Sequence, residues 1–243
     1  MRRPTALFYL YRAATSLALP FIARASVNRL RRAGVSVDSA HERLGHATAD
    51  RRAGPLIWVQ AADVDQMNSV LPLINDIARA HPEAALLLTT NTAAAAQALA
   101  DRLPARTHHQ FSPLEGFGPL RRFLHHWRPD LCVLVNSDLW PVLLDGCADA
   151  GIPVALLDTH LPDASAQGWK RFPATAGYVV RGIRMALCRD VASRNHLRDL
   201  GLEMAQMSAQ KDLSDQPTQE MARRGLAARL FDLASDRAAD AMR

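Results

Sequence analysis

The stretch Trp58-Val59-Gln60-Ala61-Ala62-Asp63-Val64-Asp65-Gln66 decides how this chain of 243 residues folds. It begins as an apolar run typical of a buried strand, passes through a tight turn and continues into a helical pattern from Met67. In open α/β sheets, ligands bind where a strand ends and the next helix begins. The turn places the carboxyl groups of Asp63 and Asp65 and the amide of Gln66 at such a strand end. We expect these residues to belong to a ligand site, or the two aspartates to cap the following helix.

Short apolar runs alternate with helical patterns over residues 56–207. Such alternation predicts a parallel sheet with helices on both faces, and successive apolar positions are expected in strands covered on both sides. The expected strands are Leu56–Ala61, Ala84–Thr89, Arg106–Phe111, Leu131–Val135, Pro153–Asp158 and Arg184–Cys188, with Glu203–Met207 as a seventh candidate. The expected helices are Met67–Ala80, Ala93–Leu103, Pro119–Trp127, Leu139–Ala150, Asp190–Leu200 and, near the C-terminus, Gln219–Met242. The predicted fold class is α/β, a single Rossmann-like domain of three layers.

Two more polar segments follow expected strands and would therefore lie at the same edge of the sheet. Asn136 and Asp138 come after one strand, and His160 lies two residues after the next. Together with Asp63 and Asp65 they make up the predicted ligand-binding residues. The free N–H groups of a helix start favour an anionic ligand, whereas the acidic side chains disfavour one. Asp138 has the alternative of capping the helix that follows it.

Three segments carry a resemblance to a known family. The opening stretch resembles the W-V-H-A-A-S-V-G-E motif of Kdo transferases, the glycosyltransferases that attach 3-deoxy-manno-octulosonic acid to lipid A precursors. Residues 136–141 are similar to the family's E-x-E-L-W-P, and residues 158–169 to its N-A-R-L-S-x-R-S-x-x-G-W. Shorter matches in the same order are His41-Glu42-Arg43-Leu44-Gly45, Thr89-Thr90-Asn91-Thr92, Pro113–Pro129 and Asp190–Gly201.

The chain departs from this family at positions that matter for chemistry. The family's presumed catalytic base, a glutamate, is Gln66 here, and a neutral amide does not usefully accept a proton. General-base assistance is typically worth about 10²–10⁴-fold in rate. Two positions that are basic in the family are His160 and Ala164, so two permanent positive charges are replaced. Asn136 and Asp138 stand where the family has glutamates. The resemblance implies acceptor contacts at these positions and an inactive base position.

The resemblance also implies a domain organisation. Kdo transferases have two Rossmann-like domains in the GT-B arrangement, of which the N-terminal one binds the lipid A acceptor and the C-terminal one binds the CMP-Kdo donor. Here the likeness covers the acceptor domain alone, and the residues after Gly201 offer no nucleotide-binding turn. We expect an N-terminal helical segment at 1–34, an acceptor-type domain at 35–211, and a linker with a C-terminal helix at 212–243. No cofactor is expected.

Three functions remain open at this point. The chain could be a non-catalytic relative of the acceptor domain that binds a lipid A precursor, or a protein partner of envelope synthesis. It could be an active glycosyltransferase subunit that uses a partner's donor domain, with activity depending on Asp63, Asp65 or Asp138. It could instead be a repurposed scaffold without a ligand site, in which changes at the strand-end turns alter stability only.

The N-terminal segment predicts contact with a membrane. Up to Arg52 the chain carries ten arginines against three acidic residues, a net charge of +7 within a total of +5. Aromatic and apolar residues around Phe8 lie beside these arginines, and basic residues near an anionic surface contribute roughly 1 kcal/mol each. The uncharged run between Arg12 and Arg24 is shorter than the roughly 20 residues that span a bilayer. We expect an amphipathic helix at the cytoplasmic face of the inner membrane, broken or kinked at Pro20, with a soluble helix as the alternative.

Other functional classes find little support. Cys132, Cys147 and Cys188 are widely spaced and fit buried thiols in a reducing compartment. The adjacent histidine pairs lack the spacing of a metal site, so no metal is expected. No basic strand with interleaved aromatic residues indicates nucleic acid binding. The serines lack the G-x-S-x-G setting of a hydrolase.

Overall fold

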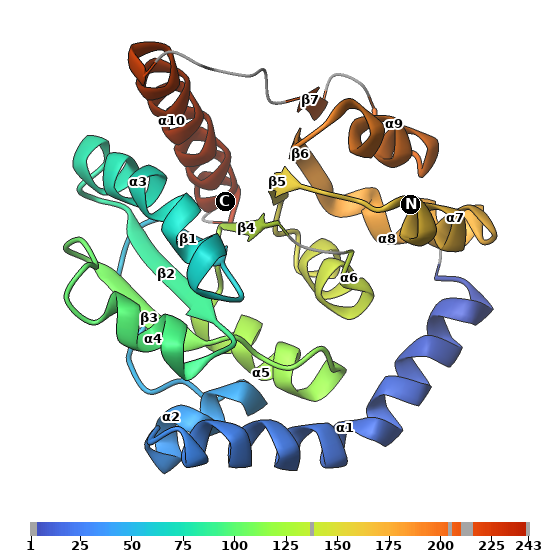
Figure 1. Ribbon diagram of the computed structural model, residues 1–243, viewed down its shortest axis with the longest axis horizontal. Helices are drawn as coiled ribbons and strands as arrows, with labels where there is room; N and C mark the ends of the chain where they lie inside the picture. Colours follow the sequence, from blue (N-terminus) through green and yellow to red (C-terminus); the bar gives the residue numbers. More distant parts are fainter. Residues whose placement is uncertain (1–3, 137–138, 204–205, 210–215, 242–243) are drawn as a thin grey trace.

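The computed structural model describes residues 4–136, 139–203, 206–209 and 216–241. At its centre lies a 7-stranded sheet in the order β3-β2-β1-β4-β5-β6-β7, with every neighbouring pair parallel (Figure 1). The strands are β1 (Leu56–Gln60), β2 (Ala85–Thr90), β3 (Thr107–Phe111), β4 (Leu131–Val135), β5 (Val154–Thr159), β6 (Ile183–Cys188) and β7 (Met207–Ala209). The expected α/β class and parallel sheet are confirmed, and the seventh strand begins where its predicted range ended.

The helices are α1 (Ala6–Arg32), α2 (Val37–His41), α3 (Val64–Ala80), α4 (Ala93–Leu99), α5 (Phe117–Trp127), α6 (Pro141–Asp149), α7 (Asp163–Lys170), α8 (Pro173–Val179), α9 (Val191–Asp199) and α10 (Gln216–Asp240), with 3-10 turns η1 (Glu42–Leu44) and η2 (Val180–Gly182). Sequence reasoning missed α2, α7 and α8, which have 5, 8 and 7 residues. Helices of about two turns or fewer show too little of the 3.6-residue period to be recognised. Helix α10 begins at Gln216, three residues before the predicted start of the C-terminal helix at Gln219.

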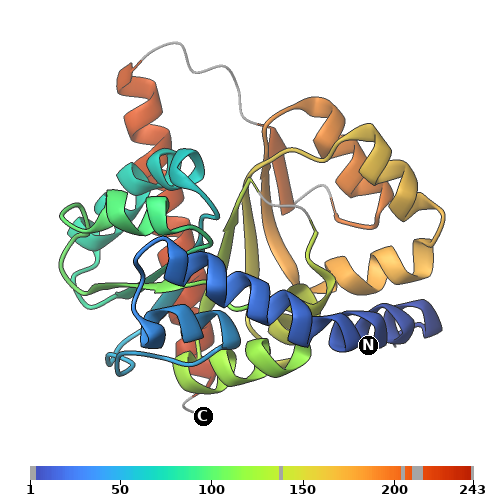
Figure 2. The ribbon, with the colours of Figure 1, turned by 60° about the horizontal axis from the view of Figure 1, so that its bottom comes forward.

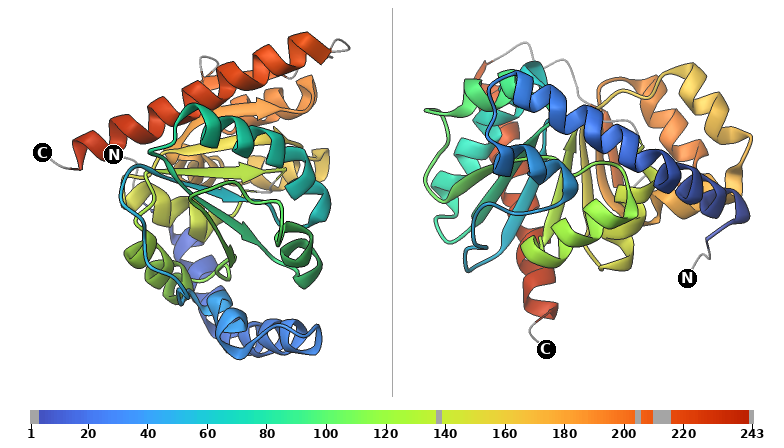
Figure 3. Two further views of the ribbon diagram at one scale, coloured as in Figure 1. Left: turned by 90° about the vertical axis from the view of Figure 1, so that its left-hand side faces the viewer. Right: turned by 90° about the horizontal axis from the view of Figure 1, so that it is seen from below.

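The sheet separates two hydrophobic cores because alternate strand residues point to opposite faces. Trp58 of β1 packs in the core that contains residues of α5, α6 and α8. Its neighbours Ile57 and Val59 pack in the other core, against α3, α4 and α10. Figure 3 shows α10 outside one face of the sheet and α1 beyond the other. The three-layer arrangement is therefore built by the alternating residues of the central strands, and all three cysteines lie buried and free within it.

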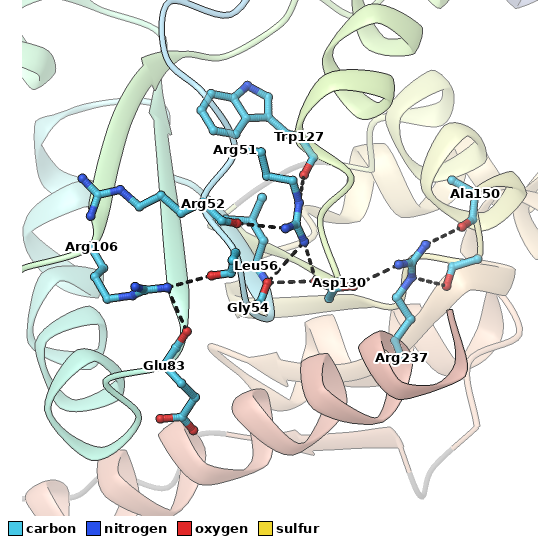
Figure 4. A network of polar contacts seen from close by, with 12 residues as sticks. Arg51, Arg52, Gly54, Leu56, Glu83, Arg106, Trp127, Asp130, Ala150 and Arg237 are labelled. Atoms are coloured by element: carbon cyan, nitrogen blue, oxygen red, sulfur yellow. Dashed lines mark hydrogen bonds and ion pairs between the residues drawn. The ribbon is translucent and has the colours of Figure 1, made fainter. Parts of the chain in front are cut away.

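A network of charged side chains attaches α10 to the edge of the sheet that is formed by the amino ends of the strands. Asp130, 3% exposed, accepts a hydrogen bond from the backbone N–H of Leu56 at 2.9 Å. The same carboxylate pairs with Arg51 at 3.2 Å and with Arg237 of α10 at 2.9 Å (Figure 4). Buried charges are tolerated when they are paired and hydrogen-bonded, and this one has partners from three separate segments. The C-terminal helix is thereby held in one position on the domain.

Helix α1 lies along the outside of the domain, and its axis changes direction near the middle (Figures 1 and 2). The helix is continuous through Pro20, so of the predicted break or kink it is the kink that fits the change of direction. Near its two ends Phe8 and Leu30 are buried, at 1% and 3% exposed. Between them, Leu17 and Phe21 are 78% and 80% exposed. The helix thus packs on the domain through its ends and presents apolar side chains outward.

Candidate functional site: the carboxyl ends of the central strands

Strands β1, β4 and β5 are neighbours in the sheet, and their carboxyl ends carry the three polar segments found in the sequence. The backbone N–H of Asn136 donates to the carbonyl of Leu157 at 2.8 Å, which joins the ends of β4 and β5. The predicted convergence of these segments on one edge is therefore present in the structure. Ser137 and Asp138 lie outside the described residues, so the predicted role of Asp138 stays a prediction.

The turn after β1 is organised by Asp63. This residue is the N-cap of α3, and its Oδ1 accepts a hydrogen bond from the backbone N–H of Gln66 at 2.9 Å. Asp65 lies exposed in the first turn of the helix, where a carboxylate interacts favourably with the helix dipole. The capping alternative is thus confirmed for Asp63 and is wrong for Asp65.

The side chain of Gln66 is engaged on both sides of its amide. Its Oε1 accepts a hydrogen bond from the backbone N–H of Ala62 at 2.8 Å. Its Nε2 donates to the carbonyl of Asn136 at a long 3.4 Å. This arrangement is close to a capping box, in which the residue three positions after the N-cap accepts from the N-cap N–H, but here the donor is Ala62, one residue before the N-cap. Gln66 therefore connects the turn after β1 with the end of β4.

The backbone at two of these strand ends lies in the left-handed region. Asn136 has φ +41° and Asp158 has φ +52°. Asn and Asp visit this region more readily than other residues with a Cβ, yet the conformation still costs free energy. Positions of this kind gather at functional sites and persist where the surroundings determine them. Both lie at motif positions identified in the sequence.

A charged cluster occupies the ends of β5 and β6. Arg189 donates to both carboxylate oxygens of Asp158, at 3.1 and 2.7 Å. His160 lies 3.0 Å from Asp190 through its Nδ1, and Asp190 caps α9 by accepting from the N–H of Ser193 at 2.6 Å. That N–H bond and the histidine lower the pKa of Asp190. His160 is thus half-exposed and tied to the neighbouring helix start rather than to Gln66 or Asn136.

Arg189 is a site residue that sequence reasoning missed. It follows β6 directly, and the rule that strand ends converge on one edge would have placed it there. Its side chain is 48% exposed, and hydrogen bonding to Asp158 raises the pKa of its guanidinium further. The edge therefore keeps a permanent positive charge. The two positions of the third segment that are basic in the family are His160 and Ala164 in this chain.

Glu115 was also missed, and it takes the capping role at the helix after β4. Its carboxylate accepts hydrogen bonds from the N–H groups of Val142 at 2.6 Å and Leu143 at 3.2 Å. Burial raises the pKa of Glu115 to about 7 despite these two bonds. The burial of Tyr11 itself, with a smaller contribution from Glu115, raises the pKa of this tyrosine on α1 to about 12. No periodicity reveals such a contact, because it joins a loop to a helix 27 residues away.

The motif ahead of β1 is structural. Arg43 is buried and donates to Asn91 at 2.8 Å, to Ser26 of α1 at 3.0 Å and to the carbonyl of Ser112. Burial, with a smaller contribution from Arg29, lowers its pKa to about 10. Glu42 accepts from the N–H of Phe111 at 2.7 Å. These two charges bind α1 and the ends of β2 and β3 together, away from the strand ends that carry the polar cluster.

A family search agrees with this architecture. The family described as 3-deoxy-D-manno-octulosonic-acid transferase (kdotransferase) matches residues 38–214, well over half of the chain. The chain belongs to the Kdo transferase family. Its suspected membership is thereby confirmed, and the three strand-end segments all lie within the matched residues.

Curated relatives carry the same name. The chain is 32% identical over 128 residues to the "Probable 3-deoxy-D-manno-octulosonic acid transferase, mitochondrial" of Arabidopsis thaliana, covering 53% of this chain and 29% of that protein. It is 33% identical over 123 residues to the 3-deoxy-D-manno-octulosonic acid transferase of Rickettsia prowazekii, covering 49% of this chain and 26% of that protein. Among solved structures, a UDP-N-acetylglucosamine 2-epimerase is similar at 10% identity with a TM-score of 0.46, covering 69% of this chain and 54% of that chain. The chain spans about a third of the length of the curated relatives it matches.

Proposed function

We propose that this member of the Kdo transferase family binds a phosphorylated lipid A precursor at the carboxyl ends of β1, β4 and β5 and does not itself transfer a sugar. The observation that carries the proposal is that the side chain of Gln66 is neutral and already hydrogen-bonded. A general base needs an acceptor for the proton of the attacking hydroxyl. The Gln66 amide is neutral, and its oxygen already accepts the N–H of Ala62 at 2.8 Å. The position supports the strand-end turn rather than proton transfer.

The proposed ligand contacts are Asn136, His160 and Arg189, with Asp63 holding the first turn in place. Arg189 uses Nε and Nη2 for Asp158, and its Nη1 has no hydrogen-bond partner among the described residues. A guanidinium with a free edge is suited to a phosphate oxygen. Asp65 and Asp138 remain proposed acceptor contacts for sugar hydroxyls. Lipid A precursors combine phosphates with hydroxyls, which matches the mixed charge of this edge.

We place the protein peripherally at the cytoplasmic face of the inner membrane. By length and composition alone α1 is long and apolar enough to cross a membrane. The length argument therefore does not exclude spanning, contrary to the expectation from the run between Arg12 and Arg24. Burial of Phe8 and Leu30 near the two ends nevertheless supports a helix that stays docked along the domain. Its outward residues would then enter the membrane interface side-on.

The test is binding and turnover measured on the same protein. Purified chain is titrated with tetraacyl lipid A precursor and, separately, with the fully deacylated phosphosugar. Arg189→Ala should weaken binding of the deacylated phosphosugar about tenfold, the value of one charge-assisted contact. Arg224→Ala, which removes an exposed charge on α10, serves as the control and should leave it unchanged. Incubation with CMP-Kdo and the precursor should give no product.

Three results would contradict the proposal. Sugar transfer by the purified chain would show that it is an enzyme. Transfer that appears when a partner supplies a donor domain, and that disappears on combined Asp63, Asp65 and Asp138→Asn substitution, would establish the glycosyltransferase-subunit alternative. Absence of binding, with stability alone changed by substitutions at the strand ends, would establish the scaffold alternative.

A further inference from the structure

An apolar pocket of about 410 Å³ lies beside the proposed acceptor residues. Helix α1 contributes Phe8 and Tyr11 to its wall, the segment leading into α6 contributes Leu139, and α7 contributes Gly168 and Trp169. The remaining lining residues come from these same segments and from the start of α8. A site of this size falls in the lower part of the range for small-molecule pockets, roughly 300–1,000 Å³.

The walls of the pocket are held in place by specific contacts. Thr5, the N-cap of α1, shares a hydrogen bond of 2.6 Å with Thr175 of α8. Phe8 meets Tyr178 of α8 edge-to-face, with 5.2 Å between ring centroids. The hydroxyl of Tyr178 donates to the buried Asp145 of α6 at 2.6 Å. Figure 2 shows the first turns of α1 running next to α8. The opening between α1 and α7 is therefore a built feature of the fold.

Two segments of the pocket wall directly follow proposed acceptor residues along the chain. Leu139 lies three residues after Asn136, and α7 begins three residues after His160. The same two loops that bring polar side chains to the edge of the sheet thus form apolar walls farther on. On its other side the pocket is bordered by α1, whose Leu10 is 66% exposed. A molecule with a phosphorylated sugar and an attached acyl chain matches this sequence of polar edge, apolar pocket and apolar outer surface.

We propose that this pocket receives one acyl chain of the glycolipid acceptor. The inference rests on the proposed function, because the polar edge is what directs a glycolipid to this place. Burial of apolar surface supplies the binding free energy, in proportion to the methylene groups removed from water. The pocket volume admits one chain of a tetraacyl precursor, and the other chains stay with the membrane and the exposed face of α1.

Gly168 allows a clean test. It lines the pocket, its φ is not in the left-handed region, and a Cβ added there meets no atom within 4 Å. Gly168→Leu therefore fills the pocket with a good helix former and should leave the domain folded. Gly225 of α10 has the same free space in a helix far from the pocket. Gly225→Leu is the matched control.

Binding of tetraacyl precursor and of its fully deacylated phosphosugar is measured for each variant by calorimetry. Gly168→Leu should weaken binding of the acylated ligand at least tenfold, the effect of losing about two buried methylenes, and leave the deacylated ligand unchanged. Gly225→Leu should alter neither. Independently, 9,10-dibromostearate should quench the emission of Trp169 in the unsubstituted protein, and the quenching should disappear in Trp169→Phe and in Gly168→Leu.

The outcomes separate the two proposals. If the deacylated phosphosugar binds and Gly168→Leu leaves the acylated precursor at its original affinity, the acyl pocket is wrong and the proposed function stands. If the phosphosugar does not bind while dibromostearate quenching persists and depends on Gly168, the proposed function fails and the pocket remains an acyl site. Absence of quenching in the unsubstituted protein overturns the pocket assignment.

Discussion

Two substitutions at Gln66 distinguish a structural role of this residue from a catalytic one. Gln66→Leu removes both hydrogen bonds of the amide. The bond from Ala62 is short and caps a helix start, so its loss should cost about 0.5–1.5 kcal/mol. The bond to the Asn136 carbonyl, at 3.4 Å, lies near the limit of a hydrogen bond and should add a few tenths of a kcal/mol at most. We expect Gln66→Leu to lower the free energy of unfolding by about 1–2 kcal/mol.

Gln66→Glu restores the carboxylate that Kdo transferases have at this position. It keeps an oxygen for the N–H of Ala62, and a negative charge near the start of α3 gains about 0.3–1 kcal/mol from the helix dipole. It loses the long bond to the Asn136 carbonyl, and a carboxylate oxygen then lies next to that carbonyl oxygen and is repelled by it. These effects nearly cancel, so the free energy of unfolding should stay within about 1 kcal/mol of the original. Because the carboxylate would remain engaged with Ala62, the substitution should not produce sugar transfer.

Urea unfolding followed by circular dichroism gives both free energies, and product formation from CMP-Kdo gives the activity. The reasoning is refuted if Gln66→Leu is as stable as the original chain, because the amide would then not bridge the turn and the end of β4. It is equally refuted if Gln66→Glu transfers sugar, because the position would then need only a carboxylate to work as a base.

Three further predictions concern the framework around the site. Asp130→Asn should lower the free energy of unfolding by about 2–4 kcal/mol in urea titrations, since it leaves two arginines, 22% and 24% exposed, without their buried partner; a loss under about 1 kcal/mol would mean that α10 is not held there. Gly45→Ala should lower the free energy of unfolding by about 3 kcal/mol or more, because a Cβ there would lie 1.9 Å from the Pro119 carbonyl oxygen. Gly34→Ala, at the same φ of +84° but with free space, should lower it by about 1–2 kcal/mol, and equal shifts of the melting temperature for the two variants would contradict this. Glu115 has a pKa raised to about 7, so the folded state holds the proton of this carboxyl more tightly than the unfolded state does. The stability that this group contributes should therefore decline as the pH rises from about 4.5 through 7. Glu115→Gln should flatten that decline when the free energy of unfolding is measured across this interval, and an unchanged slope would exclude the effect.

Much of the framework follows from short-range patterns. Successive apolar residues in runs such as Leu131–Val135 identify strands covered on both faces, and the alternation with helices fixes a parallel sheet. Because parallel strands end at one edge, the sequence also predicts that Asn136 lies close to the turn that contains Gln66. What it could not give is the pairing of single side chains. Nothing in the order of residues shows that Arg189 would pair with Asp158, since their contact depends on the register of β5 and β6.

Long-range contacts explain the remaining differences. Glu115 lies in a loop on another part of the chain and accepts hydrogen bonds from N–H groups at the start of α6. Such capping by a distant residue leaves no local signal in the sequence. Helices α7 and α8 are short and follow one another at Pro173, so they read as loop. The pocket beside the site depends on them and on the docking of α1. A sequence pattern that predicts the edge of the sheet therefore does not predict the shape of the cavity next to it.

Two residues at the strand ends have side chains that suit the backbone conformation found there. Where the family has glutamate and asparagine, this chain has Asn136 and Asp158, and both residues adopt left-handed φ values. Asn and Asp tolerate that conformation better than a longer side chain, so the replacement of glutamate by Asn136 eases the strain at its position. The hydrogen bond from Asn136 to Leu157 then keeps the two strand ends in register. Under the proposed function, a fold that holds its loops in this way keeps the proposed acceptor surface although Gln66 stands at the position of the base. The proposed function therefore predicts binding without transfer.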